Sequence, residues 1–114
     1  MSDCLFCKMV AGEIDADIVY EDDDVFAFRD INPQAPTHVL IVPKEHTSTI
    51  NDMNSGDAQI MGRLFLGAKK VAEQEGISEV GYRTVMNCNE DAGQTVFHIH
   101  LHVLGGRRMS WPPG

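Results

Sequence analysis

The stretch His98-Ile99-His100-Leu101-His102 places three of the five histidines of this chain at alternating positions among apolar residues. In a β-strand, successive side chains point to opposite faces of the sheet, so residues i, i+2 and i+4 share one face. A strand here would therefore carry three imidazoles on one face, roughly 6–7 Å apart along the strand. The apolar residues between them would point into a core. Three groups that titrate near neutral pH, set in one row, indicate chemistry rather than packing.

Around this stretch, the sequence predicts an α+β fold with a five-stranded antiparallel sheet. Short β-prone segments between turn residues predict the strands, at residues 18–20, 25–28, 38–42, 82–86 and 95–104. Apolar residues at helical spacing predict a short helix within residues 4–12 and one long helix over residues 55–76. Ser55 would cap the long helix and Gly76 would end it. Short connections between the strands favour helices on one side of the sheet.

Length and composition limit the class of protein. With 114 residues, we expect one domain spanning residues 1–114. A net charge of −8 argues against nucleic acid or an anionic membrane as a partner, because both would repel the chain. The sequence contains neither an apolar run that spans a bilayer nor a secretory signal pattern, so the expected compartment is the cytoplasm. Three cysteines without scaffold spacing predict no disulfide framework.

The residues alone leave three interpretations of the histidine row. Three imidazoles and a water form a known catalytic zinc geometry, so the row suits a metal site. Alternatively, one imidazole attacks an electrophile while its neighbours orient it and stabilise charge. The third interpretation is a set of half-buried histidines with satisfied hydrogen bonds. Three polar rings at a period of two make this last interpretation the least favoured, because each ring needs partners and packs no better than Val or Thr.

The loop before the row favours phosphate chemistry. Residues 91–95 offer backbone N–H groups, the amide of Gln94 and the hydroxyl of Thr95. Gly93 permits close approach of the backbone to a ligand, and it equally suits a turn with positive φ. Such a set of donors suits phosphate oxygens. An attacking imidazole beside a phosphate site implies phosphoryl or nucleotidyl transfer through a phosphoramidate intermediate.

The motif His-x-His-x-His-x-x at residues 98–104 resembles that of the histidine triad (HIT) family. Residues 30–38, the pair Gly93-Gln94 and the tail at residues 104–114 resemble its Hint branch, the purine nucleoside phosphoramidases. The resemblance covers nearly the whole chain. It implies a HIT-like fold and a homodimer whose strands pair into one continuous sheet. It also implies hydrolysis of adenosine or guanosine 5′-phosphoramidates, with AMP or GMP as the bound nucleotide and no cofactor required for catalysis.

The chain departs from the Hint branch at three positions before the row. Thr95 stands where that branch usually has Ser, Ala92 where a second Gly is common, and Phe97 where Tyr is frequent. Threonine keeps the hydroxyl, so the expected reaction class is unchanged. A purine-nucleotide-binding regulatory or scaffold protein with vestigial catalysis is the alternative function. The intact triad and the phosphate loop favour the enzyme.

The resemblance assigns a role to each functional residue. His100 resembles the nucleophile that carries the nucleotide, and His102 contacts the phosphate and the leaving group. His38 and His98 form a supporting shell that helps to set tautomers, and Asp30 accepts hydrogen bonds from the ribose hydroxyls. The other implied substrate contacts are Ile31, Phe28 and Phe6 at the purine, Asn87 near the ribose and phosphate, and Gly93, Gln94 and Thr95 at the phosphate.

The segment Cys4-Leu5-Phe6-Cys7 raises a separate question about a metal. A Cys-x-x-Cys pair alone is a modest zinc signal, because a structural site needs four ligands. Resemblance to bacterial members of the family implies a structural zinc held by Cys4, Cys7, His46 and His98. In that case His98 belongs to the metal site rather than to the shell around the nucleophile. The alternative is two reduced thiols at the start of a short helix.

Overall fold

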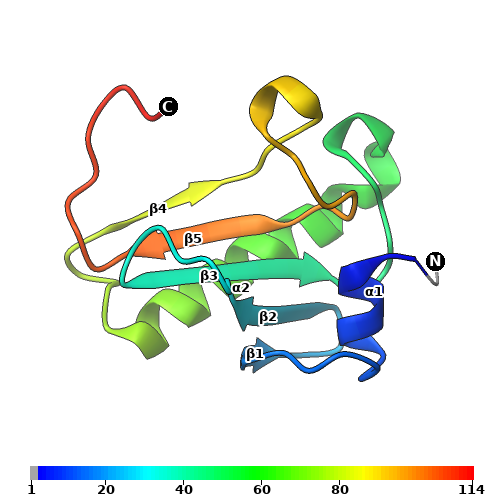
Figure 1. The fold of residues 1–114 in the computed structure, drawn as a ribbon, viewed down its shortest axis with the longest axis horizontal. Helices are drawn as coiled ribbons and strands as arrows, with labels where there is room; N and C mark the ends of the chain where they lie inside the picture. The colour runs from blue at the N-terminus through cyan, green and yellow to red at the C-terminus, as the bar shows by residue number, and fades with distance from the viewer. Residues whose placement is uncertain (1–2) are drawn as a thin grey trace.

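The computed structural model describes residues 3–114, which contain five strands and two α-helices (Figure 1). In chain order these elements are α1 (Leu5–Val10), β1 (Ile18–Glu21), β2 (Val25–Arg29), β3 (Thr37–Pro43), α2 (Ala58–Glu75), β4 (Tyr82–Val85) and β5 (Leu101–Gly105). Each lies where the sequence predicts an element of its kind, so the predicted α+β fold is confirmed. Within the described residues, no helix is both long enough and apolar enough to cross a membrane.

The sheet has the order β1-β2-β3-β5-β4, and every neighbouring pair of strands is antiparallel. After β3, α2 carries the chain along one face of the sheet, so β4 forms at an edge (Figure 1). The last strand then returns between β3 and β4. The end of the histidine row therefore lies inside the sheet, with hydrogen-bonded neighbours on both sides.

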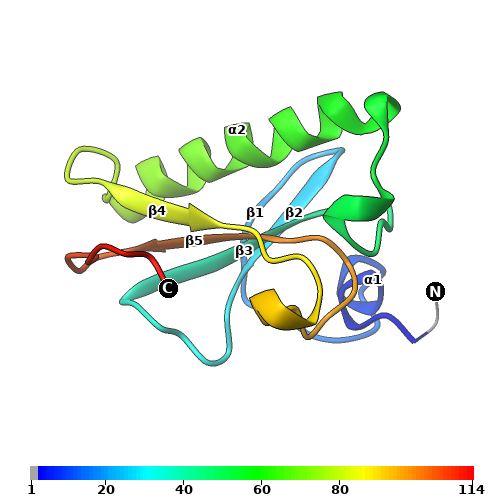
Figure 2. The same cartoon turned by 90° about the horizontal axis from the view of Figure 1, so that it is seen from above.

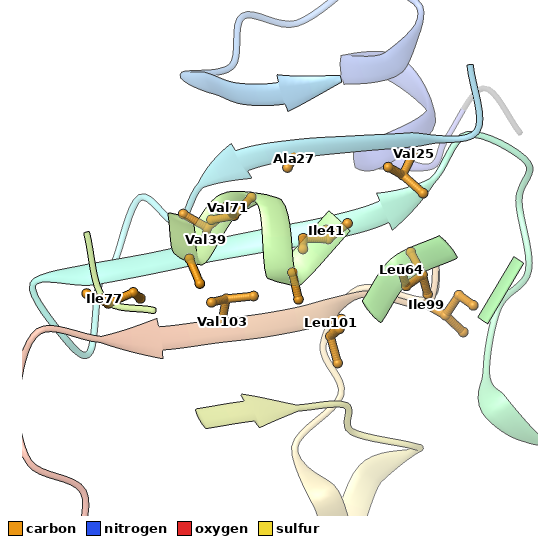
Figure 3. Packing of buried hydrophobic residues seen from close by; sticks show 12 residues of the cluster. Val25, Ala27, Val39, Ile41, Leu64, Val71, Ile77, Ile99, Leu101 and Val103 are labelled. Atoms are coloured by element: carbon orange, nitrogen blue, oxygen red, sulfur yellow. The ribbon is translucent and has the colours of Figure 1, made fainter. Parts of the chain in front are cut away.

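Each face of the sheet has its own hydrophobic core. Under α2, the core contains side chains from β2, β3, β5 and the helix; Figure 3 labels Val25, Ala27, Val39, Ile41, Leu64, Val71, Ile77, Ile99, Leu101 and Val103. On the other face, Phe6 of α1 packs with Phe26, Phe28, Leu40 and Val42. The prediction of helices on one side is therefore wrong (Figure 2). Successive residues of β2 and β3 are apolar, so both faces of these strands need cover.

The two ends of α2 test the predicted caps. Gly76 has φ 74°, and its N–H bonds back to the last turn, so the predicted stop is confirmed. The predicted start is wrong, because residues Ser55–Asp57 form a separate 3-10 turn and α2 begins at Ala58. Asn54 caps that turn by accepting the N–H of Gly56 at 2.8 Å, and its own N–H donates to Asp57 at 2.9 Å.

The strand that carries the histidine row is shorter than predicted, because β5 begins only at Leu101. The pairing of β3 with β5 ends at Ile41 and Leu101; continued in the same register, it would place Pro43 opposite Ile99. Proline has no N–H to donate, and the Pro43 carbonyl accepts the Nε2–H of His98 at 2.7 Å. The N–H of Ile99 donates instead to the Thr47 carbonyl at 2.8 Å. His98 and His100 therefore lie outside the ladder, just before the first residue of β5.

Candidate active site

His100 has one ring nitrogen held by the backbone and one without a backbone partner. It is buried, and its Nδ1–H donates to the carbonyl of His98 at 2.8 Å. Burial lowers the pKa of His100, so the ring is neutral at pH 7. A neutral imidazole with its proton on Nδ1 keeps a lone pair on Nε2. Phe6 packs edge-on against the ring at a centroid distance of 5.1 Å, and this contact helps to fix its orientation.

Backbone and side-chain hydrogen bonds also set the tautomers of His38 and His102. The N–H of Gln34 donates to Nδ1 of His38 at 3.0 Å. Burial lowers the pKa of His38, so its single proton sits on Nε2 and donates to Nδ1 of His102 at 2.9 Å. His102 then carries its own proton on Nε2. Burial, reinforced by the charges of the neighbouring histidines, lowers the pKa of His102 to about 4.

The site therefore pairs an acceptor with a donor. At neutral pH, Nε2 of His100 offers a lone pair and Nε2 of His102 offers an N–H. The two rings lie 5.0 Å apart between centroids. A lone pair can attack an electrophilic centre while the neighbouring N–H donates to an oxygen bound to that centre.

Asp30 lies beside His38 at the end of β2. Its Oδ2 is 3.4 Å from Nε2 of His38, and its Oδ1 accepts the N–H of Asn32 at 2.8 Å. Asp30, His38 and His102 place three ligand-type atoms within 4.8 Å of one another. The proton on Nε2 of His38 makes its contact with His102 a hydrogen bond, and a ring nitrogen that bears a proton cannot bind a metal. His38 and His102 are therefore joined by a hydrogen bond, and the carboxylate of Asp30 lies beside that bond.

Cys4, Cys7, His46 and His98 form a second cluster at α1, with ligand atoms within 4.8 Å of one another. Nδ1 of His98 lies 3.3 Å from Sγ of Cys4 and 3.5 Å from Sγ of Cys7. Nδ1 of His46 lies 3.4 Å from Sγ of Cys7 and 3.3 Å from Nδ1 of His98. Ligands at tetrahedral zinc distances are about 3.4 Å apart for N–N pairs and about 3.6 Å apart for S–N pairs. The four residues therefore fit a zinc ion.

The surroundings of this cluster agree with that fit. Nε2–H of His98 donates to a carbonyl, and Nε2 of His46 lies 3.2 Å from the hydroxyl of Ser48. Metal-binding histidines typically use their second nitrogen in this way. Sγ of Cys4 also accepts the N–H of Cys7 at 3.4 Å. Burial, followed by the hydrogen bond with Cys4, raises the pKa of the Cys7 thiol to about 11, so metal binding would release a proton from it.

The triad imidazoles themselves do not converge on a common metal. Nδ1 of His98 faces the cysteines, whereas Nδ1 of His100 and Nδ1 of His102 make hydrogen bonds elsewhere. Among the described residues, His98 shares its metal-ligand cluster with Cys4, Cys7 and His46, not with the other two members of the row. The interpretation of the row as a three-histidine zinc centre is therefore not supported.

The other predicted substrate contacts differ in their exposure to solvent. Phe6 and Phe28 are buried with their rings 5.3 Å apart between centroids, whereas Ile31 is 98% exposed. Asn87 is half-buried and follows β4. In the loop, Gly93 has φ 90° and Thr95 is exposed.

Gln94 is buried and tied to the backbone around it. Its amide NH₂ donates to the Ser48 carbonyl at 2.8 Å and to the Val96 carbonyl at 3.2 Å, and its Oε1 accepts the N–H of Asn89 at 2.8 Å. With these three bonds, the side chain of Gln94 is used to shape the loop. The hydroxyl of Thr95 is the more accessible of the two predicted phosphate contacts.

The cavities on the described surface include two of similar size. One, of about 420 Å³, adjoins the metal-ligand cluster and is lined by Asp3, Cys4, Leu5, His46, Thr95, Val96 and Phe97. The other, of about 460 Å³, lies among charged residues near the start of α2, including Asp24, Lys44 and Arg63. Neither lining contains His100 or His102, so neither cavity marks the position of these two imidazoles.

Comparison with known proteins agrees with this geometry. The HIT domain model matches residues 11–109. The chain belongs to the HIT domain family. Among HIT relatives, the purine nucleoside phosphoramidase of Escherichia coli K12 is 54% identical over 105 residues, covering 92% of this chain and 88% of the relative. The predicted family is therefore confirmed.

Solved structures of HIT proteins give the same result. The HIT family hydrolase from Legionella pneumophila Philadelphia 1 superposes with a TM-score of 0.96 at 58% identity, covering 98% of this chain and all of the other. A histidine triad nucleotide-binding protein from Candida albicans superposes with a TM-score of 0.82 at 29% identity, covering 96% and 83% of the two chains. The predicted HIT-like fold is therefore confirmed.

Two residues that fix the site were not predicted from the sequence. Gln34 sets the tautomer of His38 through its N–H, and Pro43 anchors the ring of His98 through its carbonyl. Both act through main-chain groups, which carry no signature in residue type. The signal that was available is their position, since each lies next to a segment that contains a predicted site residue.

Proposed function

We propose that this HIT protein hydrolyses purine nucleoside 5′-phosphoramidates through a nucleotidyl-histidine formed on His100. The observation that carries the proposal is the lone pair on Nε2 of His100 beside the N–H on Nε2 of His102. The name of the E. coli relative, purine nucleoside phosphoramidase, supports the substrate class.

The reaction has two steps. In the first, Nε2 of His100 attacks the phosphorus, the P–N bond breaks, and the amine leaves with a proton taken from the solvent. In the second, water attacks the same phosphorus, the bond from His100 breaks, the nucleoside monophosphate leaves, and the proton returns to the solvent. The carbonyl of His98 stabilises the charge that develops on the His100 ring, because it accepts the Nδ1–H throughout.

The remaining site residues bind the substrate. His102 donates Nε2–H to a phosphate oxygen, and Asp30 accepts the ribose hydroxyls. The other proposed contacts are Phe6, Phe28 and Ile31 at the purine, and Asn87, Gly93 and Thr95 at the ribose and phosphate. The exposure of Ile31 supports a purine slot, because stacking against a purine would cover the apolar surface that Ile31 leaves in water. Gln94 contributes by shaping the loop.

We also propose that the protein is a homodimer with a structural zinc in each chain. Strand β4 is at the edge of the sheet, so one row of its backbone groups is open to pairing with a second copy. Zinc bound to Cys4, Cys7, His46 and His98 would stabilise the fold around α1, and catalysis requires no cofactor. Cys4, Cys7 and Cys88 form no disulfide, which supports a cytoplasmic location.

The test is His100→Ala, assayed with an adenosine 5′-phosphoramidate against Lys69→Met as a control. Lys69 lies on the exposed side of α2, across the sheet from the triad. His100→Ala should lower kcat at least a thousandfold and leave AMP binding within a few-fold, because the nucleophile acts only in the chemical step. Intact-mass analysis of denatured wild type should detect a nucleotide adduct that His100→Ala lacks. Turnover retained by His100→Ala would exclude the mechanism, and AMP binding by a wild type without turnover would favour the regulatory protein.

A further inference from the structure

The segment Gly105-Gly106-Arg107 lies against the turn that sets the tautomer of His38. Gly106 has φ 88°, a conformation that favours glycine, and a Cβ built there would lie 2.9 Å from Cβ of Pro36. Gly105 pairs with Thr37 in the sheet. The end of β5 is therefore held tightly against residues 34–37.

Arg107 makes the polar contact between this tail and the turn. Its Nε–H donates to the carbonyl of Gln34 at 3.1 Å, and its Nη1–H donates to the carbonyl of Arg108 at 3.3 Å. Gln34 uses its other main-chain group, the N–H, on Nδ1 of His38. Gln34 therefore accepts a hydrogen bond from Arg107 through its carbonyl and donates one to His38 through its N–H.

We propose that Arg107 is a positioning residue for the reaction, because it keeps the N–H of Gln34 on His38 and thereby keeps the Nε2 proton of His102 toward the substrate phosphate. The inference rests on the proposed function for the identity of the substrate. The hydrogen-bonded chain runs from Arg107 through Gln34 and His38 to His102, with contacts of 3.1, 3.0 and 2.9 Å. Arg107 does not touch the substrate.

The direction of each proton gives the chain its effect. If the N–H of Gln34 leaves His38, the proton of His38 can move to Nδ1, and Nε2 becomes an acceptor. His102 then donates from Nδ1 and turns a lone pair on Nε2 toward the phosphate. A lone pair facing an anionic oxygen is repulsive, whereas the normal N–H stabilises the charge on that oxygen in the transition state. Loss of the hydrogen bonds that link Arg107 to His102 should therefore lower kcat more than it raises KM.

The expected effect is moderate, because Arg107 and Gln34 are exposed and the turn has a second tie. The side-chain amide of Gln34 donates to the carbonyl of Asn32 at 3.1 Å. We expect Arg107→Met to lower kcat about three- to tenfold, the range of an exposed hydrogen bond to a charged group. KM should stay within about twofold.

The control is Arg108→Met, which removes the same charge from the next residue. Arg107→Lys serves as the conservative variant, since an ammonium group can still donate to the Gln34 carbonyl. Two measurements are made on all three variants and the wild type: steady-state kinetics with an adenosine 5′-phosphoramidate, and ¹⁵N NMR of the imidazole nitrogens of His38 and His102, which reports the tautomer without any substrate.

Support requires that Arg107→Met shifts both rings away from the Nε2–H tautomer and lowers kcat, while Arg108→Met matches wild type and Arg107→Lys recovers at least part of both. Unchanged tautomers in Arg107→Met overturn the inference even if kcat falls, since a merely structural role would lower kcat in that way. Shifted tautomers with unchanged kcat overturn the role in the reaction. If wild type does not cleave the phosphoramidate but Arg107→Met shifts the tautomers of both rings, the hydrogen-bond relay from Arg107 to His102 is supported and the proposed function fails.

Discussion

The titration of His102 should make the fold lose stability between pH 7 and pH 5. Its pKa is about 4 in the folded protein, chiefly because the ring is partly buried, against 6.5 as the ordinary value. Since the folded pKa is depressed, the unfolded chain binds more protons in this range. The stabilisation is therefore fully present above pH 6.5 and is lost as the pH falls toward 4.

The two pKa values determine the size of the effect. A gap of about 2.5 pH units corresponds to about 3.4 kcal/mol in full. Linkage over the measurable range gives a loss of about 1.8 kcal/mol between pH 7 and pH 5. The surface carboxylates titrate as well, so the contribution of His102 has to be isolated by a matched variant.

The variant is His102→Asn, whose amide oxygen can still accept the Nε2–H of His38. Urea unfolding of both proteins, followed by circular dichroism at pH 7, 6 and 5, gives the difference in unfolding free energy at each pH. Wild type should lose about 1.8 kcal/mol more than His102→Asn. Two curves that stay parallel within about 0.5 kcal/mol would refute the reasoning, as would an NMR titration of His102 with a midpoint above pH 5.5.

Three further predictions concern stability and metal content. Gly105→Ala should destabilise the fold by about 1–3 kcal/mol, because its Cβ would lie 2.5 Å from Cδ1 of Ile77; Gly62→Ala, with open space on α2, should stabilise it by about 0.5–1 kcal/mol in the same urea experiment. Replacing Cys4 and Cys7 by Ser should remove about one zinc per chain by elemental analysis and lower Tm, while Cys88→Ser keeps the metal; equal zinc in all variants would exclude this site. Arg29→Met should cost about 1 kcal/mol of unfolding free energy, because it breaks a two-bond ion pair with Glu75 at 2.8 and 2.9 Å, whereas Lys69→Met, which loses only an exposed pair, should cost almost nothing.

Local pattern predicted the elements of this fold well and their arrangement less well. The strands at β2 and β3 and the stop of α2 at Gly76 follow from apolar runs and from a glycine, signals that lie within a few residues. The position of α1 on the face opposite α2 depends on which residues of distant strands lie beside Phe6. The start of α2 was predicted wrongly because Ser55, the expected cap, lies in a 3-10 turn that Asn54 and Asp57 stabilise.

The candidate site shows the same division. Resemblance to the family implied the four metal ligands, and the structure brings them together. It also implied roles for His38 and His102 near the nucleophile, but the hydrogen bond that joins these two rings was not predicted. The tautomers of the histidines could not be predicted from the sequence, because the N–H of Gln34 and the carbonyls of Pro43 and His98 determine them. Every residue has such groups except for the missing N–H of proline, so only the folded backbone shows which of them meets an imidazole.

The early end of β5 allows one row of histidines to serve two separate environments. A ladder extended through Ile99 would hold all three imidazoles at a regular repeat above one flat surface. The ladder instead stops at the Ile41–Leu101 pair, and His98 faces the thiols of α1 while His100 and His102 stay beside each other. The carbonyl of Pro43 accepts the Nε2–H of His98, which leaves Nδ1 of that ring to face the thiols. One alternating motif therefore supplies both a metal-ligand cluster and a separate pair of imidazoles.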